Sequence, residues 1–201
     1  MYLLFESIKI ENNLIINSDY HIERMIKSVK ELFNIERSFN FDFLFSEINT
    51  LGSSVYKLRI IYNKDIIEYE IEKYKKRKIN TLKIVNTNNS DIYSLKFLDR
   101  KKINELYNLR DDCDDILIVS GDYILDSSIA NLVFYNGFEW HTPTSYLLNG
   151  TKRQFLLNNN IIKEKNIRLS DLKKYKSFQL INAMLDFDRD DNILDINNII
   201  L

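Results

Sequence analysis

The chain has 201 residues and a mass of 24.0 kDa, which suffices for one domain or for two small halves that share a core. Apolar residues make up 45% of it and charged residues 28%, values that exclude a disordered or fibrous protein. With Lys+Arg at 28 and Asp+Glu at 29, the net charge of -1 favours neither nucleic acid nor an anionic membrane as a partner.

Other features of the sequence indicate the cellular location of the protein and the residues that form its turns. No apolar run approaches the roughly 20 residues that cross a bilayer, and the residues before Glu6 lack the basic region of a signal peptide. The single cysteine, Cys113, excludes an intramolecular disulfide. We therefore expect a soluble, cytoplasmic protein. With only 4 Gly and 1 Pro, its turns must rely on Asn and Asp, which tolerate the left-handed region.

The first 80 residues alternate between strand and helix patterns. A helix capped by Ser18 or Asp19 carries apolar residues at helical spacing as far as Phe33. The other elements expected here are a strand over 2–10 that returns over 14–16, a helix over about 41–51, and strands over 55–62 and 66–74 joined by a hairpin.

Beyond about residue 80 the segments become shorter. Asn136-Gly137 is a strong hairpin signal between two of the expected strands. We expect strands over 81–86, 115–119, 123–126, 130–135 and 138–141, helices over 100–110 and 151–159, and strand-like stretches over 161–168 and 177–183 that flank a short helix over 171–175. This pattern predicts two α/β halves with a boundary near residues 80–90 and a mostly antiparallel sheet in the second half.

Common catalytic motifs are missing from the sequence. His21 and His141 are far apart and lack zinc-site spacing, so we expect no metal. There is no GxGxxG, no GxxxxGK[ST] and no GxSxG, which removes the usual nucleotide and nucleophile-elbow motifs.

Three segments remain unusual. Lys96 lies between apolar neighbours, and a desolvated lysine can serve as a Schiff-base amine, although a surface lysine with a buried stem is the plainer reading. Asp126 to Asn131 combines a carboxylate, two hydroxyls and an amide, or is simply a turn. Asn149 to Arg153 opens a helix, whose free N–H groups can bind an anion. An amine, a carboxylate and an anion site are what pyridoxal 5′-phosphate (PLP) requires.

In that order and at about these separations, the chain resembles the class IV aminotransferase family, also called PLP fold type IV. The opening Phe5-Glu6-Ser7, the helix pair His21-x-x-Arg24, Leu95-Lys96-x-x-Asp99-Arg100 and the run Asp126 to Phe134 are similar to four motifs of the family. Further similarities are Thr142-Pro143, Leu147-Leu148 followed by Gly150-x-x-Arg153, and Ile181-Asn182-Ala183. The resemblance implies an α+β fold of the D-amino acid aminotransferase type, with a small N-terminal α/β domain over 1–85 and a larger mixed-sheet, PLP-binding domain over 86–201.

The resemblance also implies a role for each matching residue. Lys96 would be the catalytic residue that carries PLP, and Asp126 would pair with the ring nitrogen. Arg24 would hold the phosphate. The remaining cofactor-binding residues would be Asn131, Leu147, Gly150, Thr151, Lys152, Asn182 and Ala183. Arg59 is a candidate clamp for a substrate carboxylate, with an outward-facing strand arginine as the alternative.

The chain departs from the family pattern in three places. We expect that about twenty residues of the family's N-terminal segment are absent, which would leave the pocket relatively open. Position 126 is Asp where the family usually has Glu, so the carboxylate is one methylene shorter. The tail after Leu185 lacks the family's usual "PV" ending.

The motifs look most like those of the 4-amino-4-deoxychorismate lyase branch, which forms 4-aminobenzoate and pyruvate in folate biosynthesis. A class IV aminotransferase for branched-chain or D-amino acids is the first alternative, and a non-catalytic PLP-fold remnant is the second. In each case we expect a homodimer, because members of the family build their active sites near a subunit interface.

Overall fold

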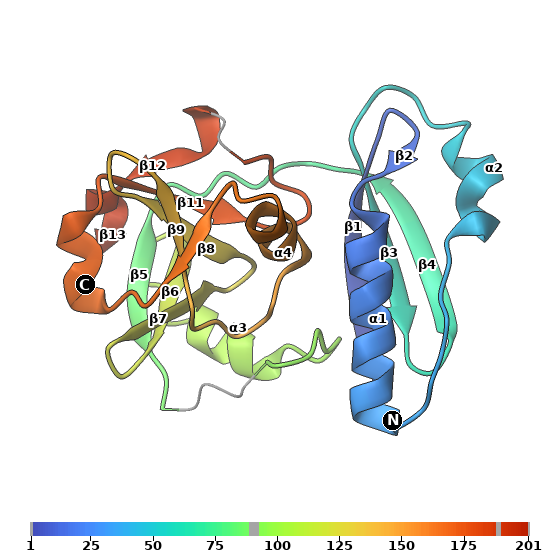
Figure 1. Cartoon of the computed structure of the whole chain (residues 1–201), viewed down its shortest axis with the longest axis horizontal. Helices are drawn as coiled ribbons and strands as arrows, with labels where there is room; N and C mark the ends of the chain where they lie inside the picture. The colour runs from blue at the N-terminus through green and yellow to red at the C-terminus, as the bar shows by residue number, and fades with distance from the viewer. Residues whose placement is uncertain (1, 89–92, 188–189, 201) are drawn as a thin grey trace. The chain divides into compact units, whose positions relative to one another are not determined.

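The computed structural model describes residues 2–88, 93–187 and 190–200 and divides into two compact units (Figure 1). The first comprises Met1–Lys76 and Leu95–Asp99, and the second Arg77–Ser94 and Arg100–Leu201. The expected domains divide the chain once, after residue 85. In the structure the first unit ends at Lys76, and the chain returns to it for the five residues Leu95–Asp99, which include Lys96. None of the described helices is both long and apolar enough to cross a membrane.

An antiparallel sheet forms the first unit, in the order β2-β1-β3-β4. Its strands are β1 (Leu4–Glu11), β2 (Leu14–Ile15), β3 (Tyr56–Tyr62) and β4 (Ile66–Lys73), close to the predicted ranges. Since alternate residues of a strand face the same side, Leu4, Ile8 and Ile10 of β1 enter the core together with Leu58 and Ile60 of β3.

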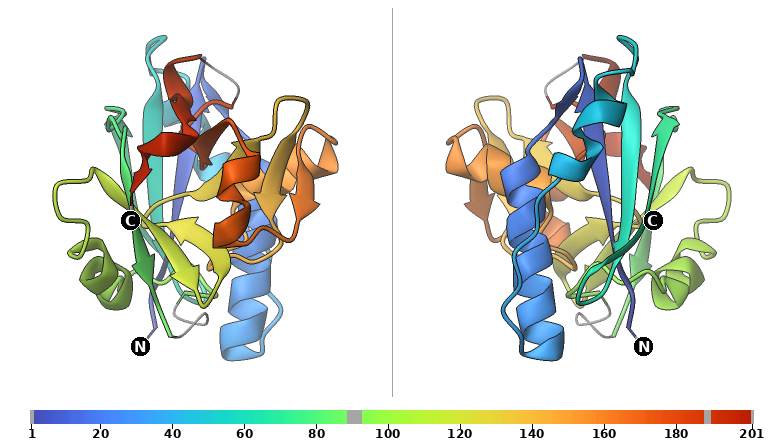
Figure 2. Two further views of the ribbon diagram at one scale, coloured as in Figure 1. Left: turned by 90° about the vertical axis from the view of Figure 1, so that its left-hand side faces the viewer. Right: turned by 90° about the vertical axis from the view of Figure 1, so that its right-hand side faces the viewer.

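Helix α1 (Ser18–Phe33) covers this core face, as its apolar spacing predicts, with Met25 and Val29 completely buried (Figures 1 and 2). The predicted cap is wrong. The N-cap is Asn17 in a left-handed conformation, and its side chain makes no capping hydrogen bond. The turn after β2 thus starts the helix by its backbone shape rather than by a hydroxyl or carboxylate at Ser18 or Asp19.

The helix expected over 41–51 is much shorter. A 3-10 turn over Asp42–Leu44 leads into α2 (Phe45–Ile48); Phe41, Leu44 and Ile48 are buried in the core, and Leu51 packs partly against it. The 3-10 turn and α2 together suffice to bury the three side chains. The next residues therefore leave the helix toward β3.

The segment Leu95–Asp99 pairs with the start of β1. The amide of Phe5 donates to the carbonyl of Lys96 at 3.0 Å, and the amide of Leu98 donates to the carbonyl of Leu3 at 2.8 Å. Leu95 and Phe97 pack against the core of the first unit. Lys96 is thereby held by backbone hydrogen bonds at the edge of this sheet.

The second unit contains two mixed sheets, which confirms the mixed-sheet domain that the family resemblance implies and corrects the one mostly antiparallel sheet predicted from the pattern. The five-stranded sheet, in the order β10-β9-β8-β11-β12, has one parallel pair, β9 with β10. In the four-stranded sheet, β13-β5-β6-β7, only β6 and β7 are antiparallel. The strands are β5 (Leu82–Asn86), β6 (Asp115–Ser120), β7 (Tyr123–Ser127), β8 (Asn131–Tyr135), β9 (Trp140–Pro143), β10 (Lys163–Lys165), β11 (Ser177–Ile181), β12 (Ile193–Asp195) and β13 (Ile199–Ile200).

Several short elements differ from their predicted ranges. The stretch 161–168 contributes only β10, and the helix expected at 171–175 is a 3-10 helix over Leu169–Lys174. The helices predicted over 100–110 and 151–159 are α3 (Lys101–Tyr107) and α4 (Thr151–Asn158). Strand β13, at the C-terminal end, runs alongside β5 (Figure 2). A strand of two residues forms only because a distant strand pairs with it, and its sequence is too short to show a pattern that predicts it.

Asn and Asp replace Gly in the left-handed turns, as the composition predicts. Six such positions among the described residues carry Asn or Asp and two carry Gly. The residues are Asn12, Asn13, Asn17, Asn34, Asp111 and Asn160, with Gly121 and Gly137. At Asn136-Gly137 the predicted hairpin joins β8 and β9, and Gly137 adopts a φ of 104°.

Asn34, which ends α1 with a φ of 55°, allows a test of this use of asparagine. A residue without a short polar side chain pays the full steric cost of the left-handed region, so Asn34→Ala should lower the free energy of unfolding by about 1 kcal/mol. Asn34→Gly should leave it unchanged or raise it. Urea denaturation measures both. Asn108→Ala is the control, because Asn108 ends α3 with a φ of -68°, and an equal loss there would contradict the explanation.

Candidate active site

The predicted site residues fall into two groups, one in each unit. Arg24, Arg59 and Lys96 belong to the first unit, and the other predicted residues belong to the second. Within each unit, a buried carboxylate organises the neighbouring polar side chains.

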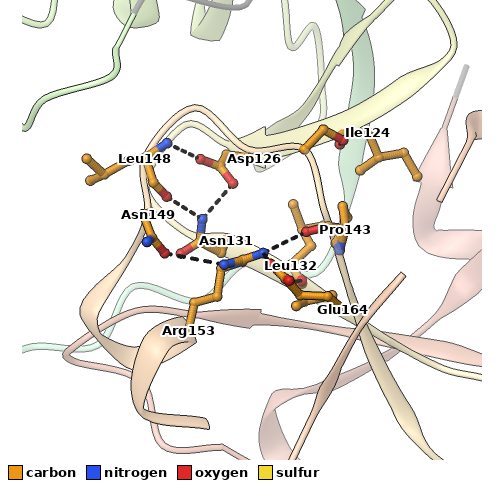
Figure 3. A network of polar contacts seen from close by, with 11 residues as sticks. Ile124, Asp126, Asn131, Leu132, Pro143, Leu148, Asn149, Arg153 and Glu164 are labelled. Carbon is orange, nitrogen blue, oxygen red and sulfur yellow. Dashed lines mark hydrogen bonds and ion pairs between the residues drawn. The ribbon is translucent and has the colours of Figure 1, made fainter. Parts of the chain in front are cut away.

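Asp126 is the centre of the second group (Figure 3). It lies near the end of β7, is only 5% exposed, and accepts three hydrogen bonds. The Asn131 amide donates to its Oδ1 at 2.7 Å, and the backbone N–H groups of Leu147 and Leu148 donate to its Oδ2 at 2.9 Å each. The same Asn131 amide donates to the Leu148 carbonyl at 2.8 Å. The predicted residues Asp126, Asn131 and Leu147 are therefore brought together.

Burial raises the pKa of Asp126 from 3.8 to about 6, despite these hydrogen bonds and the charge of Arg153, which act in the opposite direction. Its three donors are neutral dipoles, and their stabilisation of the charged form is smaller than the cost of removing it from water. A carboxylate offers about four lone-pair positions, so one more donor can be accommodated. A protonated ring nitrogen is a suitable fourth donor, because its charge would stabilise the ionised carboxylate.

The start of α4 requires Gly150 for reasons of space. A Cβ atom at this position would lie 2.1 Å from Oδ1 of Asn131. The φ of -67° is open to any residue, so the restriction is contact and not backbone strain. Thr151 and Lys152, both buried, occupy the first turn of α4. The N–H groups of a first helical turn and the helix dipole favour an anion, and the absence of a side chain at Gly150 lets this turn lie against Asn131.

Arg153 holds the segment that leads into α4 (Figure 3). Its guanidinium donates to the carbonyl of Pro143 at 3.0 Å and to Oδ1 of Asn149 at 3.3 Å, and it forms an ion pair with Glu164. Its side chain is almost completely buried and lies over the ring of Tyr146. Arg153 thus links β9, the following turn, α4 and β10.

Asn182 and Ala183 follow β11 in a turn. Oδ1 of Asn182 accepts from the N–H of Met184 at 2.9 Å and of Leu185 at 3.2 Å, while its amide donates to the Ile129 carbonyl at 3.3 Å. Asn182 therefore ties this turn to the segment between Asp126 and Asn131. Both residues are half-buried.

The first group is organised by Glu6 on β1. This side chain is fully buried and accepts hydrogen bonds from Arg24 Nε at 2.8 Å, from Arg24 Nη2 at 2.5 Å and from His21 Nδ1 at 2.7 Å. Although burial opposes ionisation, Arg24 and His21 lower the pKa of Glu6 to about 2. Burial, together with the charges of Arg24 and Lys96, lowers the pKa of His21 more than Glu6 raises it, so the imidazole is neutral near pH 7.

Lys96 and Arg59 share one aromatic neighbour in the first unit. Nζ of Lys96 lies 4.5 Å from the centre of the Phe5 ring, and Cζ of Arg59 lies 5.2 Å from it. Phe5 itself is buried, whereas both cationic residues are half-buried. Cations are attracted to the face of an aromatic ring. Phe5 therefore keeps an amine and a guanidinium on the same part of the sheet.

The donor set agrees with the requirements of PLP. A buried carboxylate with one lone-pair position beyond its three donors, the first turn of α4 and, in the other unit, a guanidinium fixed in orientation are the kinds of group that bind a ring nitrogen and a phosphate. Lys96 adds a primary amine.

The comparisons with known proteins agree with this chemistry. The profile for amino-transferase class IV matches residues 3–187. The chain belongs to the class IV aminotransferase family. A Haemophilus influenzae protein of uncharacterized function is 34% identical over 186 residues, which cover 92% of this chain and 98% of that protein.

Solved structures show the same fold. A proposed 4-amino-4-deoxychorismate lyase from Haemophilus somnus is 34% identical, with a TM-score of 0.83 over 92% of this chain and 97% of that one. A proposed amino-acid aminotransferase from Mesorhizobium loti, 19% identical, gives a TM-score of 0.77 over 97% and 98% of the two chains. A protein described as a hypothetical aminotransferase from Mycobacterium tuberculosis, in its PLP-bound form and 15% identical, gives a TM-score of 0.74 over 90% and 78% of the two chains. The predicted family, the type IV fold and PLP as the cofactor are supported together.

Glu6 and Arg153 have clear structural roles that their sequence motifs do not reveal. Glu6 is the charged member of the alternating series Leu4, Glu6, Ile8, and Arg153 is a cation in the first turn of α4. A charge at a core-facing strand position demands a partner, and the His21-x-x-Arg24 spacing on α1 could have supplied it. For Arg153, whose partners are scattered over three segments, no comparable signal exists.

Gly150→Ala tests the packing at the start of α4. The added methyl must displace Asn131 or the helix start, so we expect a loss of about 1–3 kcal/mol in the free energy of unfolding, as for other overpacked sites. Urea denaturation measures this loss. In the control, Gly52→Ala, the new Cβ would meet its nearest atom at 3.9 Å, and a change within about 0.5 kcal/mol is expected. Equal effects of the two variants would show that the close approach to Asn131 is unimportant.

Proposed function

We propose that this protein is a PLP-dependent, cytoplasmic 4-amino-4-deoxychorismate lyase that forms 4-aminobenzoate and pyruvate for folate biosynthesis. The observation that carries the choice of reaction is the 34% identity, across almost the full length of both chains, to the proposed lyase from Haemophilus somnus. The Leu95-Lys96-x-x-Asp99-Arg100 motif is also most similar to that branch of the family.

In this proposal the two groups of residues divide the work of binding PLP. Arg24, the N–H groups of Thr151 and Lys152, and the turn at Asn182 and Ala183 bind the phosphate. Gly150 begins the turn that binds it, and Leu147 lies against the ring. Asp126, held by Asn131, accepts a hydrogen bond from the protonated ring nitrogen. When bound, PLP supplies an electron sink for negative charge that develops on the substrate.

Lys96 is the proposed catalytic residue. Its amine first carries the cofactor and then removes the proton from the substrate carbon that bears the amino group. A positioned general base typically contributes about 10² to 10⁴-fold. The bond between the ring and the ether oxygen then breaks, and enolpyruvate leaves and takes up a proton to become pyruvate. The six-membered ring becomes aromatic, which supplies much of the driving force.

Arg59 is the proposed partner of a substrate carboxylate. It lies beside the same Phe5 ring as Lys96, and no carboxylate of a described residue forms an ion pair with it. A guanidinium donates two parallel hydrogen bonds to a carboxylate, so Arg59 can orient an acid whose amino end meets Lys96.

A class IV aminotransferase is the second candidate, because the profile that matches residues 3–187 is that of the aminotransferases. Transamination uses the same amine, carboxylate and phosphate site but must also release one keto acid and admit another. A third candidate, a PLP-fold protein without turnover, would bind the cofactor and react with neither class of substrate.

Covalent attachment of PLP is the first test. Protein incubated with PLP should show an absorbance band that borohydride shifts, and peptide mapping should place the reduced adduct on Lys96. Lys96→Ala should abolish the adduct, whereas the control Lys102→Ala, which changes an exposed lysine on α3, should retain it. An adduct on another lysine would refute the assignment.

The reaction is tested by a product assay. Purified protein should release 4-aminobenzoate from 4-amino-4-deoxychorismate, and Lys96→Ala should lower the rate by at least about 10²-fold. Asp126→Ala should retain some bound PLP through the phosphate site yet lose turnover. D- and L-amino acids with 2-oxoglutarate are assayed in parallel. Turnover with these alone would make the protein an aminotransferase, and inactivity with both classes would favour the remnant.

We also propose that the protein acts as a homodimer. Sedimentation velocity at micromolar concentration should then give twice the chain mass of 24.0 kDa. An active species with the mass of one chain would exclude this assembly.

A further inference from the structure

The carboxylate of Glu6 has no role in the proposed chemistry, although it is completely buried in the first unit. It lies on β1 between the inward-facing apolar residues Leu4 and Ile8. A buried carboxylate is costly unless charged or hydrogen-bonding partners compensate it. Its position thus depends on the partners that α1 provides.

Both carboxylate oxygens engage the same face of α1. Oε1 accepts from Arg24 Nε, and Oε2 accepts from Arg24 Nη2 and His21 Nδ1, over 2.5–2.8 Å. This bidentate pairing fixes the plane of the guanidinium. It uses the edge between Nε and Nη2, so the edge between Nη1 and Nη2 is directed away from Glu6.

An ionised Glu6 has two opposite effects on an anion that binds Arg24. Its negative charge offsets the guanidinium charge and weakens the attraction. Its hydrogen bonds hold the side chain of Arg24 in one orientation, so less conformational freedom is lost on binding. The balance of these effects decides whether Glu6 hinders or assists the binding of an anion.

We propose that Glu6, supported by His21, is a positioning residue that orients Arg24 toward the cofactor phosphate and so makes the site select PLP over unphosphorylated pyridoxal. This inference rests on the proposed function, in which Arg24 binds the phosphate. It assigns to Glu6 a contribution to ligand selectivity in addition to any contribution to stability.

The variant Glu6→Gln separates orientation from charge. Glutamine keeps the shape, and its amide can donate to His21 Nδ1 when the imidazole proton moves to Nε2. Its single carbonyl oxygen accepts from only one nitrogen of Arg24, so the bidentate pairing is lost while the guanidinium gains net positive charge. If orientation dominates, phosphate selectivity falls; if charge dominates, selectivity rises.

The measurement is the ratio of the dissociation constants of pyridoxal and PLP, obtained by absorbance titration of the full-length protein. Glu6→Gln should lower this ratio by about tenfold or more, the loss expected for one charge-assisted hydrogen bond. The control, Glu23→Gln, removes an exposed ion pair with Lys27 on the same helix and should leave the ratio unchanged. A general loss of stability would weaken both ligands alike.

Arg24→Lys supplies the second comparison. A lysine keeps the charge but has no planar edge for Glu6 to orient, so Glu6→Gln should have little further effect on the ratio in the Arg24→Lys background. If Glu6→Gln does not fold, His21→Gln, which removes one supporting donor, should lower the ratio to a smaller extent.

An unchanged or increased ratio in Glu6→Gln, or in His21→Gln if that variant has to be used, overturns the inference while the proposed function stands. An equal drop in the Arg24→Lys background shows that Glu6 does not act through Arg24 and overturns it as well. A wild-type protein that binds no PLP overturns both the inference and the proposed function.

Discussion

The second unit depends on the hydrogen bonds that meet at Asp126. They join the end of β7, the first residue of β8 and the turn before α4, segments separated by 5 to 22 residues along the chain. No regular backbone pairing connects this turn to the two strands, so the carboxylate and the Asn131 amide supply the connection. The position of the first turn of α4, and of any phosphate bound there, follows from it.

The two buried carboxylates show how the charge of a partner decides the direction of a pKa shift. Both Glu6 and Asp126 are nearly inaccessible to water, and both accept three hydrogen bonds. The pKa of Glu6 falls to about 2 because a guanidinium is among its donors, whereas that of Asp126 rises to about 6 because its donors are neutral. Glu6 has its cationic partner within the chain, and Asp126 is suited to receive one from a ligand.

The elements with long periodic patterns could be predicted from the sequence, and the short ones could not. Helix α1 and strands β3 and β4 agree with their predicted ranges because many residues share each pattern. The predictions for 41–51 and 161–168 were wrong. Burial of a few side chains decided the structure of the first stretch, and pairing with a distant strand decided that of the second. In the site, the order of the motifs predicted that Asp126 and Asn131 belong together. The ion pair of Glu6 with Arg24 could not be predicted from the motifs alone, because they do not show which face of β1 packs against α1.

In the sequence, the apolar residues on either side of Lys96 suggested that its amine is desolvated. In the structure, these residues anchor the backbone instead. Leu95 and Phe97 are anchored in the core of the first unit, while the pairing with β1 sets Lys96 beside the Phe5 ring on the other face of the sheet. Residues 95–97 meet β1 through one isolated bridge, between Phe97 and Leu4, so this pairing and the packing of Leu95 and Phe97 hold the segment. Leu95 and Phe97 therefore fix the backbone at Lys96, and the amine of Lys96 lies over the Phe5 ring. In the proposed chemistry Lys96 needs a backbone held in place, and the two backbone hydrogen bonds between this segment and the start of β1 provide it.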